Sequence, residues 1–220
     1  KRQHNDLRLG ENPALVKAIE SGNKIIPIYI WDEKDSDLHT GSAGKWWLHQ
    51  SLDRLSNRIE ELGNKLVLRK GDPKSILQEF ISQNKVSKIF MNRRFEPQII
   101  ERDEGILSQI DHEITNGNLL FDPEDIRTKQ DKQYTVFTPF WKNCKMQTEP
   151  HEPLAIPSEI PAPDKFPESL SLDEMGLLPK IKWYETFEKK WRPGEEEANR
   201  ILVHFLKSEA RKYGKQRNIP

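Results

Sequence analysis

Two arginines and a glutamate follow an apolar run near the middle of this 220-residue chain. The run is Lys88–Asn92, and Arg93, Arg94 and Glu96 come directly after it. A carboxylate such as Glu96 can accept N–H groups from a heterocycle, and a guanidinium can face an anionic or phenolate oxygen. The spacing therefore predicts a ligand-binding loop at the end of a buried strand.

A plainer interpretation of the same residues is a solvated loop. Arg93 and Arg94 would then form ion pairs with Glu101 or Asp103, which follow within ten residues. Exposed ion pairs of this kind are common and weak. The residue types and their spacing leave both interpretations open.

Short apolar runs alternate with helical patterns and would position this loop. The alternation predicts an α/β fold, a doubly wound parallel sheet of Rossmann-like type with strand order 3-2-1-4-5. The first strand of that order is missing or altered, because Lys1–Asn5 is too polar. The predicted strands are Ile25–Ile30, Lys65–Arg69, Lys88–Asn92 and Leu119–Phe121. The first predicted helix runs from about Pro13 to Ser21, and the next has an apolar face formed by Leu48, Leu52, Leu55, Ile59 and Leu62. Another is predicted to begin at Pro73 with Asp72 as its N-cap, and a further one to contain Ile99, Ile106, Ile110 and Ile114.

Ligands of doubly wound sheets bind at the carboxyl ends of the strands, where the strand order reverses. Asn5–Leu9 follows the missing first strand, and Asn92–Glu96 follows the fourth. Both loops are therefore predicted to line one crevice. His39, after the second strand, is predicted to be exposed to solvent, with the crevice as the alternative. The predicted crevice residues are Asp6, Leu7, Arg8, Lys45, Arg94 and Glu96.

The stretch Gly41–Lys45 leads into a helix, and its backbone amides could hold an anion. It lacks the P-loop spacing, so a plain loop with an N-cap is the favoured alternative. Trp46 and Trp47 follow, and adjacent helical positions point about 100° apart, so only one of them can face the core squarely.

The composition excludes several classes of protein and of site. The 35 basic and 35 acidic residues leave no net charge, which argues against a one-sided field for DNA or a membrane. Cys144 is the single cysteine, so the chain has no internal disulfide or four-cysteine zinc site, and a reducing cytoplasm is expected. No apolar run reaches membrane-spanning length, so no membrane association is predicted. The histidines and carboxylates show no metal spacing or acid–base pairing, so no catalytic or metal-ligating residue is predicted.

The chain divides into three predicted regions. Residues 1–145 form the α/β domain. Residues 146–193 hold eight of the 15 prolines and are predicted to be an extended interdomain linker. Residues 194–220 begin an all-α domain that is expected to be truncated, because the apolar face of its first helix needs a partner. That face consists of Ala198, Ile201, Leu202, Phe205 and Leu206.

Several segments resemble DNA photolyases and cryptochromes, in the family's order and over essentially the whole chain. They are Asp6-Leu-Arg-Leu with Asn12-Pro-Ala-Leu, Gly41–Leu52, Tyr134–Asn143, Trp191-Arg-Pro-Gly-Glu and Tyr213–Pro220. The resemblance implies the N-terminal part of a cyclobutane pyrimidine dimer photolyase. Such an enzyme binds UV-damaged DNA and splits the dimer by electron transfer from light-excited reduced FAD. An antenna chromophore in the α/β domain passes excitation energy to the FAD.

The resemblance also implies where cofactors bind. Tyr213 matches a position that contacts FAD, while most of the FAD site belongs to sequence beyond this chain, so this fragment alone is expected to be inactive. Glu96 matches an antenna contact, but Arg94 replaces the Asp of deazaflavin-binding relatives. Gln98 and Ile99 replace the Asn–Glu pair of folate-binding relatives. The antenna therefore remains methenyltetrahydrofolate, 8-hydroxydeazaflavin or a second flavin. A cryptochrome blue-light receptor and a stand-alone nucleotide-binding domain are the alternative functions.

Overall fold

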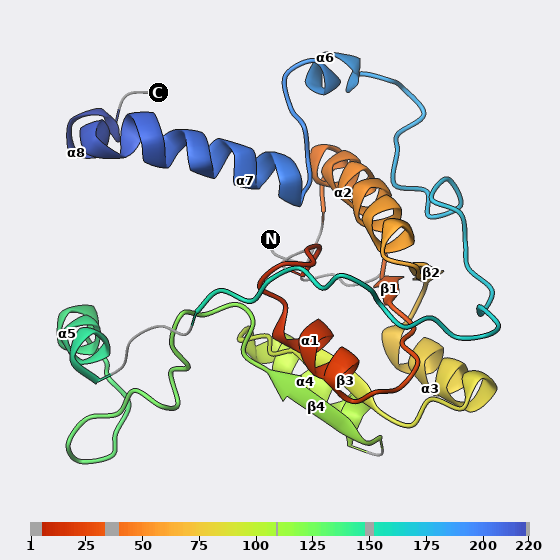
Figure 1. Ribbon diagram of the computed structural model, residues 1–220, viewed down its shortest axis with the longest axis horizontal. Helices are drawn as coiled ribbons and strands as arrows, with labels where there is room; N and C mark the ends of the chain where they lie inside the picture. Colours follow the sequence, from red (N-terminus) through yellow and green to blue (C-terminus); the bar gives the residue numbers. More distant parts are fainter. Residues whose placement is uncertain (1–5, 34–39, 109, 148–151, 219–220) are drawn as a thin grey trace. The chain divides into compact units, whose positions relative to one another are not determined.

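The computed structural model describes residues 6–33, 40–108, 110–147 and 152–218. The fold is α/β, with short parallel sheets and helices. The chain forms two compact units, each assembled from separate stretches of sequence. The first unit takes residues 1–9, 24–84 and 158–220, and the second takes 10–23 and 85–157. Figure 1 traces these stretches by colour.

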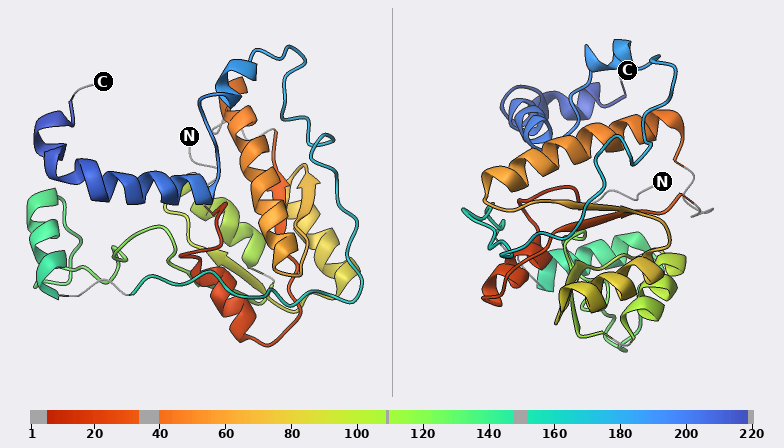
Figure 2. Two further views of the ribbon diagram at one scale, coloured as in Figure 1. Left: turned by 45° about the horizontal axis from the view of Figure 1, so that its top comes forward. Right: turned by 90° about the vertical axis from the view of Figure 1, so that its right-hand side faces the viewer.

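Two parallel strands form the sheet of the first unit. They are β1 (Ile28–Trp31) and β2 (Val67–Lys70), aligned so that Ile28 lies opposite Val67. Each overlaps a predicted apolar run and ends one residue beyond it, and Val67, Leu68 and Trp31 are buried. The helix α2 (Ser42–Glu61) connects the two strands and lies along them in Figure 2.

The predicted apolar stripe of α2 faces the core. Leu48, Leu52 and Ile59 are buried there. Trp46 is 1% exposed whereas Trp47 is 41% exposed, so only one of the adjacent tryptophans is buried, as predicted.

The next helix, α3 (Pro73–Asn84), begins as predicted. The Asp72 carboxylate accepts the backbone N–H of Ser75 at 2.8 Å and caps the helix. Phe80 is the buried residue of the helix.

Residues 158–191, which we call the strap, pack against the first unit. The strap is rich in proline and largely without regular structure, with a turn at residues 172–176, up to the short helix α6 (Glu185–Glu188). It adds to the edge of β2, because the N–H of Leu170 donates to the Leu68 carbonyl at 3.0 Å and Ser169 Oγ accepts the Leu68 N–H at 2.9 Å. The strap also contributes buried apolar side chains to the unit, namely Ile160, Met175, Leu177 and Tyr184.

The helix α7 (Glu195–His204) starts directly after the strap and is held at its first turn. Glu196 lies 3.4 Å from the Arg58 guanidinium, and Glu195 accepts the Leu9 N–H at 2.8 Å. Gly194 has φ 121°, and a Cβ there would lie 2.6 Å from Arg54 Cδ.

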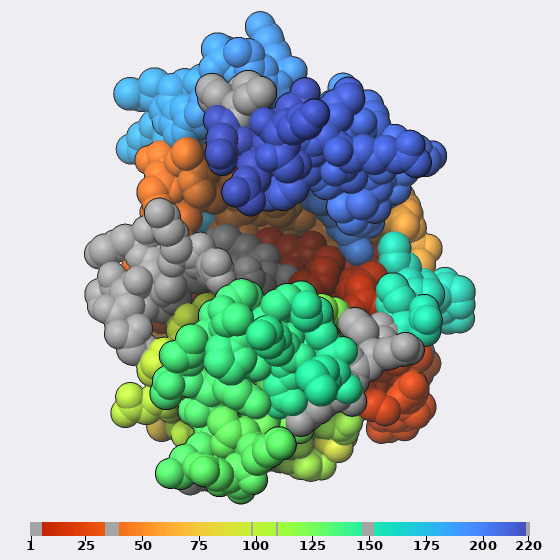
Figure 3. Space-filling model, turned by 90° about the vertical axis from the view of Figure 1, so that its left-hand side faces the viewer, coloured from red at the N-terminus to blue at the C-terminus, as the bar shows by residue number. Residues whose placement is uncertain are grey.

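Beyond its first turn, α7 has the apolar face that the sequence predicts, and the face is exposed. Ile201 and Leu202 of α7 and Leu206 just beyond it are 54%, 52% and 59% exposed, and α7 with the turns after it forms the dark blue surface in Figure 3. A π-helical turn (Phe205–Glu209), a 3₁₀ turn (Ala210–Lys212) and α8 (Tyr213–Gln216) follow.

The second unit contains the other parallel pair. Strands β3 (Ile89–Asn92) and β4 (His112–Thr115) are aligned so that Asn92 lies opposite Thr115. The helix α1 (Pro13–Glu20), at the predicted position, packs against both strands. The remaining helices are α4 (Pro97–Leu107) and α5 (Phe137–Gln147).

The prediction for residues 108–121 is wrong in two respects. The helix through Ile99 ends at Leu107, and Ile114 belongs to strand β4 rather than to that helix. Leu119–Phe121 is not a strand, because Asn116 Oδ1 accepts the Leu119 N–H at 3.1 Å and its Nδ2 donates to the Leu119 carbonyl, which makes a turn. Strand β4 is mostly polar and is defined by its backbone pairing with β3, so no apolar run marks it.

The order 3-2-1-4-5 is not confirmed, because the described residues form two separate two-stranded sheets, β1–β2 and β3–β4. Lys1–Asn5, where the first strand was predicted to be missing or altered, lies outside the described residues. His39 also lies outside them. The predicted domain boundaries remain predictions. In the described stretches, no helix has the length and apolarity needed to cross a membrane.

Candidate functional site

The loop after β3 holds its arginine and glutamate in a close pair. Arg94 Nη2 lies 3.2 Å from Glu96 Oε1, and Arg94 Nε lies 3.3 Å from Oε2. The Phe95 N–H also donates to Oε2, at 3.2 Å. The hydrogen bond from Arg94 lowers the pKa of Glu96, so this carboxylate stays ionised at neutral pH.

The two members of the pair differ in exposure. The Arg94 side chain is 14% exposed and that of Glu96 is 38% exposed. A carboxylate has about four lone-pair positions, and besides these N–H groups the backbone N–H of Glu96 itself bonds to the carboxylate. Glu96 is therefore oriented by its neighbours, while its side chain remains partly accessible to solvent.

Arg93 has a different role from Arg94. Its guanidinium lies 3.5 Å from Asp122 and 3.3 Å from Glu124. Its backbone N–H donates to the Thr115 carbonyl at 2.7 Å, which continues the β3–β4 pairing by one residue.

The partners considered for both arginines from the sequence, Glu101 and Asp103, are wrong. Arg93 pairs with residues beyond β4, Arg94 pairs with Glu96, and Asp103 pairs with Arg102 at 2.7 Å. Because strands β3 and β4 pair, the residues around Asp122 lie close to Arg93. The prediction instead chose acidic residues of α4, which are closer to Arg93 in sequence.

The predicted residues near the N-terminus belong to the first unit. Arg8 Nη1 lies 3.8 Å from Asp6 Oδ1, with the two side chains 25% and 38% exposed. Leu7 between them is half-buried. Leu9 is 3% exposed, so it anchors this short segment in the unit.

Lys45, also in the first unit, lies in the first turn of α2. Its ammonium is 6.0 Å from the centre of the Trp31 ring, at the outer limit of a cation–π contact. Trp31 is the last residue of β1 and is 3% exposed. The Lys45 N–H bonds within the helix to the Gly41 carbonyl at 2.9 Å, and Gly41 is the N-cap, so Gly41–Lys45 fits the plain loop and N-cap interpretation.

Tyr213 is the first residue of α8 and is 54% exposed. Its ring stands edge-on to Phe205 at a centroid distance of 5.9 Å. The π-helical and 3₁₀ turns between the two residues bring these rings together.

Asn92 is a residue that sequence reasoning missed. It ends β3, is 4% exposed, and bonds through its side chain to residues of α1 and β4. Its sequence signal is a single amide at the end of an apolar run, directly before the charged residues of the loop.

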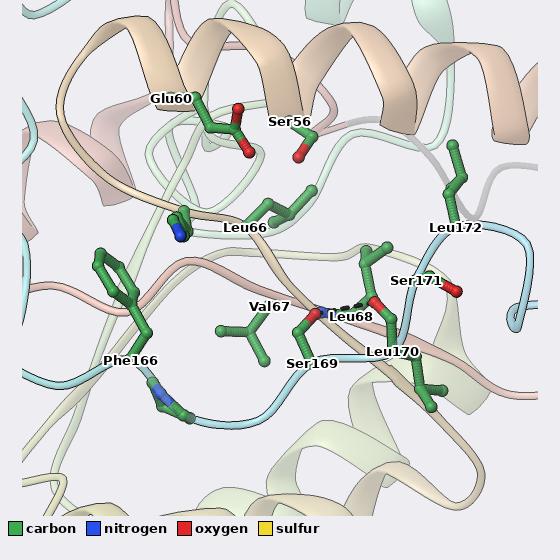
Figure 4. A pocket seen from close by; sticks show the side chains of 12 residues that line it. Ser56, Glu60, Leu66, Val67, Leu68, Phe166, Ser169, Leu170, Ser171 and Leu172 are labelled. Atoms are coloured by element: carbon green, nitrogen blue, oxygen red, sulfur yellow. Dashed lines mark hydrogen bonds between the residues drawn. The ribbon is translucent and has the colours of Figure 1, made fainter.

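A pocket of about 260 Å³ lies within the first unit, between the second half of α2, the start of β2 and the strap (Figure 4). It is at the amino end of β2, and none of the seven predicted site residues lines it. Among the described residues, no group of three or more metal-ligating side chains is arranged to hold an ion. The pocket is lined by Ser56, Glu60, Lys65–Leu68, Phe166, Pro167 and Ser169–Leu172.

Comparison with known proteins gives consistent matches. A sequence profile of the family described as DNA photolyase matches residues 3–163. The deoxyribodipyrimidine photo-lyase of Agrobacterium fabrum is 37% identical over 221 residues, covering 98% of this chain and 46% of its own length. Cryptochrome-2 of Arabidopsis thaliana is 28% identical, over 96% of this chain and 36% of that protein. A solved bacterial class III photolyase from Agrobacterium tumefaciens aligns with a TM-score of 0.83 and 36% identity, over 92% of this chain and 43% of that one. The chain thus spans less than half the length of these relatives.

Proposed function

This chain belongs to the DNA photolyase family, and we propose that it is the antenna-chromophore part of a light-driven DNA repair enzyme. The full-length protein would be a cyclobutane pyrimidine dimer photolyase that acts on UV-damaged DNA and uses FAD. The observation that carries this proposal is the oriented, ionised Glu96 at the carboxyl end of β3, within a chain that matches a photolyase over 98% of its length.

In this proposal the residues predicted from the sequence keep their roles. Glu96 accepts N–H groups of the chromophore ring, and Arg94 holds the carboxylate in place while facing an electron-rich oxygen. Asp6, Leu7, Arg8 and Lys45 are the further proposed antenna contacts, and Tyr213 is the proposed FAD contact.

The chromophore itself is proposed as one of three, methenyltetrahydrofolate, 8-hydroxydeazaflavin or a second flavin. When bound, it supplies absorption of light and transfer of excitation energy. Arg94 places a cation where deazaflavin-binding relatives are expected to have an Asp, so the loop favours a chromophore with an anionic or carbonyl edge at that point.

A loop-directed experiment tests the site. The full-length protein would be purified as Arg94→Ala and Glu96→Gln variants, and the antenna absorption band would be compared with that of the unaltered protein. We expect loss of most of the band with FAD content unchanged. Arg93→Ala is the matched control, because Arg93 pairs with Asp122 and Glu124 instead. Full antenna loading in both site variants would refute the assignment.

The activity is tested separately. The full-length protein with reduced FAD, a dimer-containing oligonucleotide and blue light should restore intact pyrimidines, whereas this chain alone should not. Repair by the isolated chain would contradict the proposal that this chain holds the antenna chromophore and that repair needs the full-length protein.

A blue-light receptor of cryptochrome type is the second candidate, favoured by the 28% identity to Cryptochrome-2. Full-length protein that binds FAD and bleaches in blue light but repairs no dimer would support it over the repair enzyme.

A further inference from the structure

Asn92 joins three elements of the second unit through one side-chain amide. Its Oδ1 accepts the Thr115 hydroxyl at 2.7 Å, at the end of β4, and the Ala14 N–H at 3.3 Å, in the first turn of α1. Its Nδ2 donates to Asn12 Oδ1 at 2.9 Å. Asn12 is the N-cap of α1 and accepts the Leu15 N–H with the same oxygen. A buried amide that both donates and accepts hydrogen bonds fixes the angle between the groups that it joins.

The residues after Asn92 are fixed from this point. The Arg93 N–H is held by the Thr115 carbonyl, and the Arg93 carbonyl accepts Asn118 Nδ2 at 3.2 Å. Arg94 and Glu96 follow within four residues of the amide. The direction in which this loop leaves β3 is therefore set by Asn92 and by the backbone hydrogen bond from the Arg93 N–H to the Thr115 carbonyl.

Gly117 shows how little room the amide has. A Cβ at residue 117 would lie 2.5 Å from Asn92 Oδ1 and 2.9 Å from its Nδ2. The backbone after β4 thus approaches the amide as closely as only a glycine allows, which confines the Asn92 side chain to one position.

We propose that Asn92 is a positioning residue for the antenna chromophore. It orients the Arg94–Glu96 pair through the backbone of the loop and itself makes no contact with the chromophore. This inference rests on the proposed function of that loop. Because a displacement of about 1 Å in an orienting group weakens a preorganised site strongly, disturbing the amide should weaken chromophore binding while the unit remains folded.

The test uses the full-length protein freed of antenna and titrated with three probes, methenyltetrahydrofolate, 8-hydroxydeazariboflavin and FMN. The probe that the unaltered protein binds most tightly is then used for the variants. Asn92→Asp keeps the size and the acceptors but loses the donor to Asn12. Gly117→Ala displaces the amide without changing it. For each we expect Kd to rise about tenfold, the size of one lost hydrogen bond to a buried partner.

Two milder variants keep the test decisive if Asn92→Asp does not fold. Thr115→Val removes one donor to the amide and should raise Kd about threefold, whereas Thr115→Ser keeps the hydroxyl and should match the unaltered protein. Gly105→Ala in α4 is the control for Gly117→Ala, because a Cβ there meets nothing within 4 Å.

A second readout separates positioning from general loosening. With the probe at saturation, Asn92→Asp should still show a shifted absorption maximum or less energy transfer to FAD, while circular dichroism and FAD content stay unchanged. Folded Asn92→Asp and Gly117→Ala proteins with Kd within twofold of the unaltered value would overturn the inference. If Arg94→Ala and Glu96→Gln also bind the probe normally, the proposed function of the loop fails instead.

Discussion

Trp46 in the first unit and Asn92 in the second are almost equally buried, at 1% and 4% exposure, but they are held in different ways. Trp46 meets the edges of Trp47 and Phe187 at centroid distances of 6.2 and 5.7 Å, and its indole N–H has no hydrogen-bond partner among the described residues. The side-chain amide of Asn92 donates one hydrogen bond, to Asn12, and accepts two, from Thr115 and Ala14. Shape and apolar area therefore specify the first position, and hydrogen-bond direction specifies the second.

The largest loss of stability is expected when Trp46 is replaced. Trp46→Ala should lower the free energy of unfolding by about 3–5 kcal/mol, because it leaves a large cavity under the strap. Urea unfolding followed by circular dichroism measures this, with Trp47→Ala as the control. Since Trp47 is 41% exposed, its replacement should cost clearly less. Equal losses for the two variants would show that Trp46 is not the centre of this packing.

The second effect concerns the amide. Asn92→Leu keeps a similar volume but leaves the Thr115 hydroxyl and the Ala14 N–H without their acceptor. We expect a loss of about 1–3 kcal/mol, the cost of unsatisfied buried groups. Urea unfolding again measures it. A neutral or stabilising result would show that shape alone also suffices in the second unit.

A polar contact should also contribute to the stability of the first unit, at the start of α3. Asp72→Ala removes the N-cap of α3 and should cost about 0.5–2 kcal/mol. The hydrogen bond from Ser75 lowers the pKa of Asp72, so this contribution is present at neutral pH and is lost as pH falls through the lowered pKa. Unfolding measurements at neutral and acidic pH check it, and Asp72→Asn should retain most of the cap.

The smallest effect is expected at His49, three residues after Trp46 on α2. Both ring nitrogens are buried and lack hydrogen-bond partners within the described part of the chain. Burial lowers the pKa of His49, although the charges of Asp53, Asp173 and Glu188 act in the opposite direction. As pH falls through about 6.5, the unfolded chain takes up the proton first, so stability should decrease there.

Unfolding free energies from pH 8 to pH 5 test this prediction, with His49→Leu as the comparison. The variant should lose part of the pH dependence in that range. Identical pH profiles for the two proteins would mean that the ring is solvated in the folded state.

The regular elements with an apolar face were predictable from the sequence. The stripe Leu48, Leu52 and Ile59 and the cap at Asp72 follow local rules of spacing and hydrogen bonding, and the structure shows both. Strand β4 was not predictable in this way, because the sequence His-Glu-Ile-Thr becomes a strand only by pairing with β3.

In the candidate site too, local contacts follow from the sequence whereas tertiary contacts do not. The pairing of Arg94 with Glu96 is local and lies within the predicted loop. The partners of Arg93 and Asn92 come from residues 12–14 and 115–124, which meet these side chains only after the chain has folded. Charge and spacing therefore located the loop, whereas the groups that hold it depend on tertiary contacts.

The strap has a consequence for the order of events during protein synthesis. The edge of β2 is covered by Ser169 and Leu170, Trp46 contacts Phe187, and Trp47 contacts Trp191, roughly 120 positions after Lys70. At ribosomal speeds of about 5–20 residues per second, roughly 6–24 s separate the synthesis of Lys70 from that of Trp191. During that interval a strand edge and a tryptophan face lack their cover, so nascent chains should be more vulnerable to aggregation and chaperone capture than the finished protein.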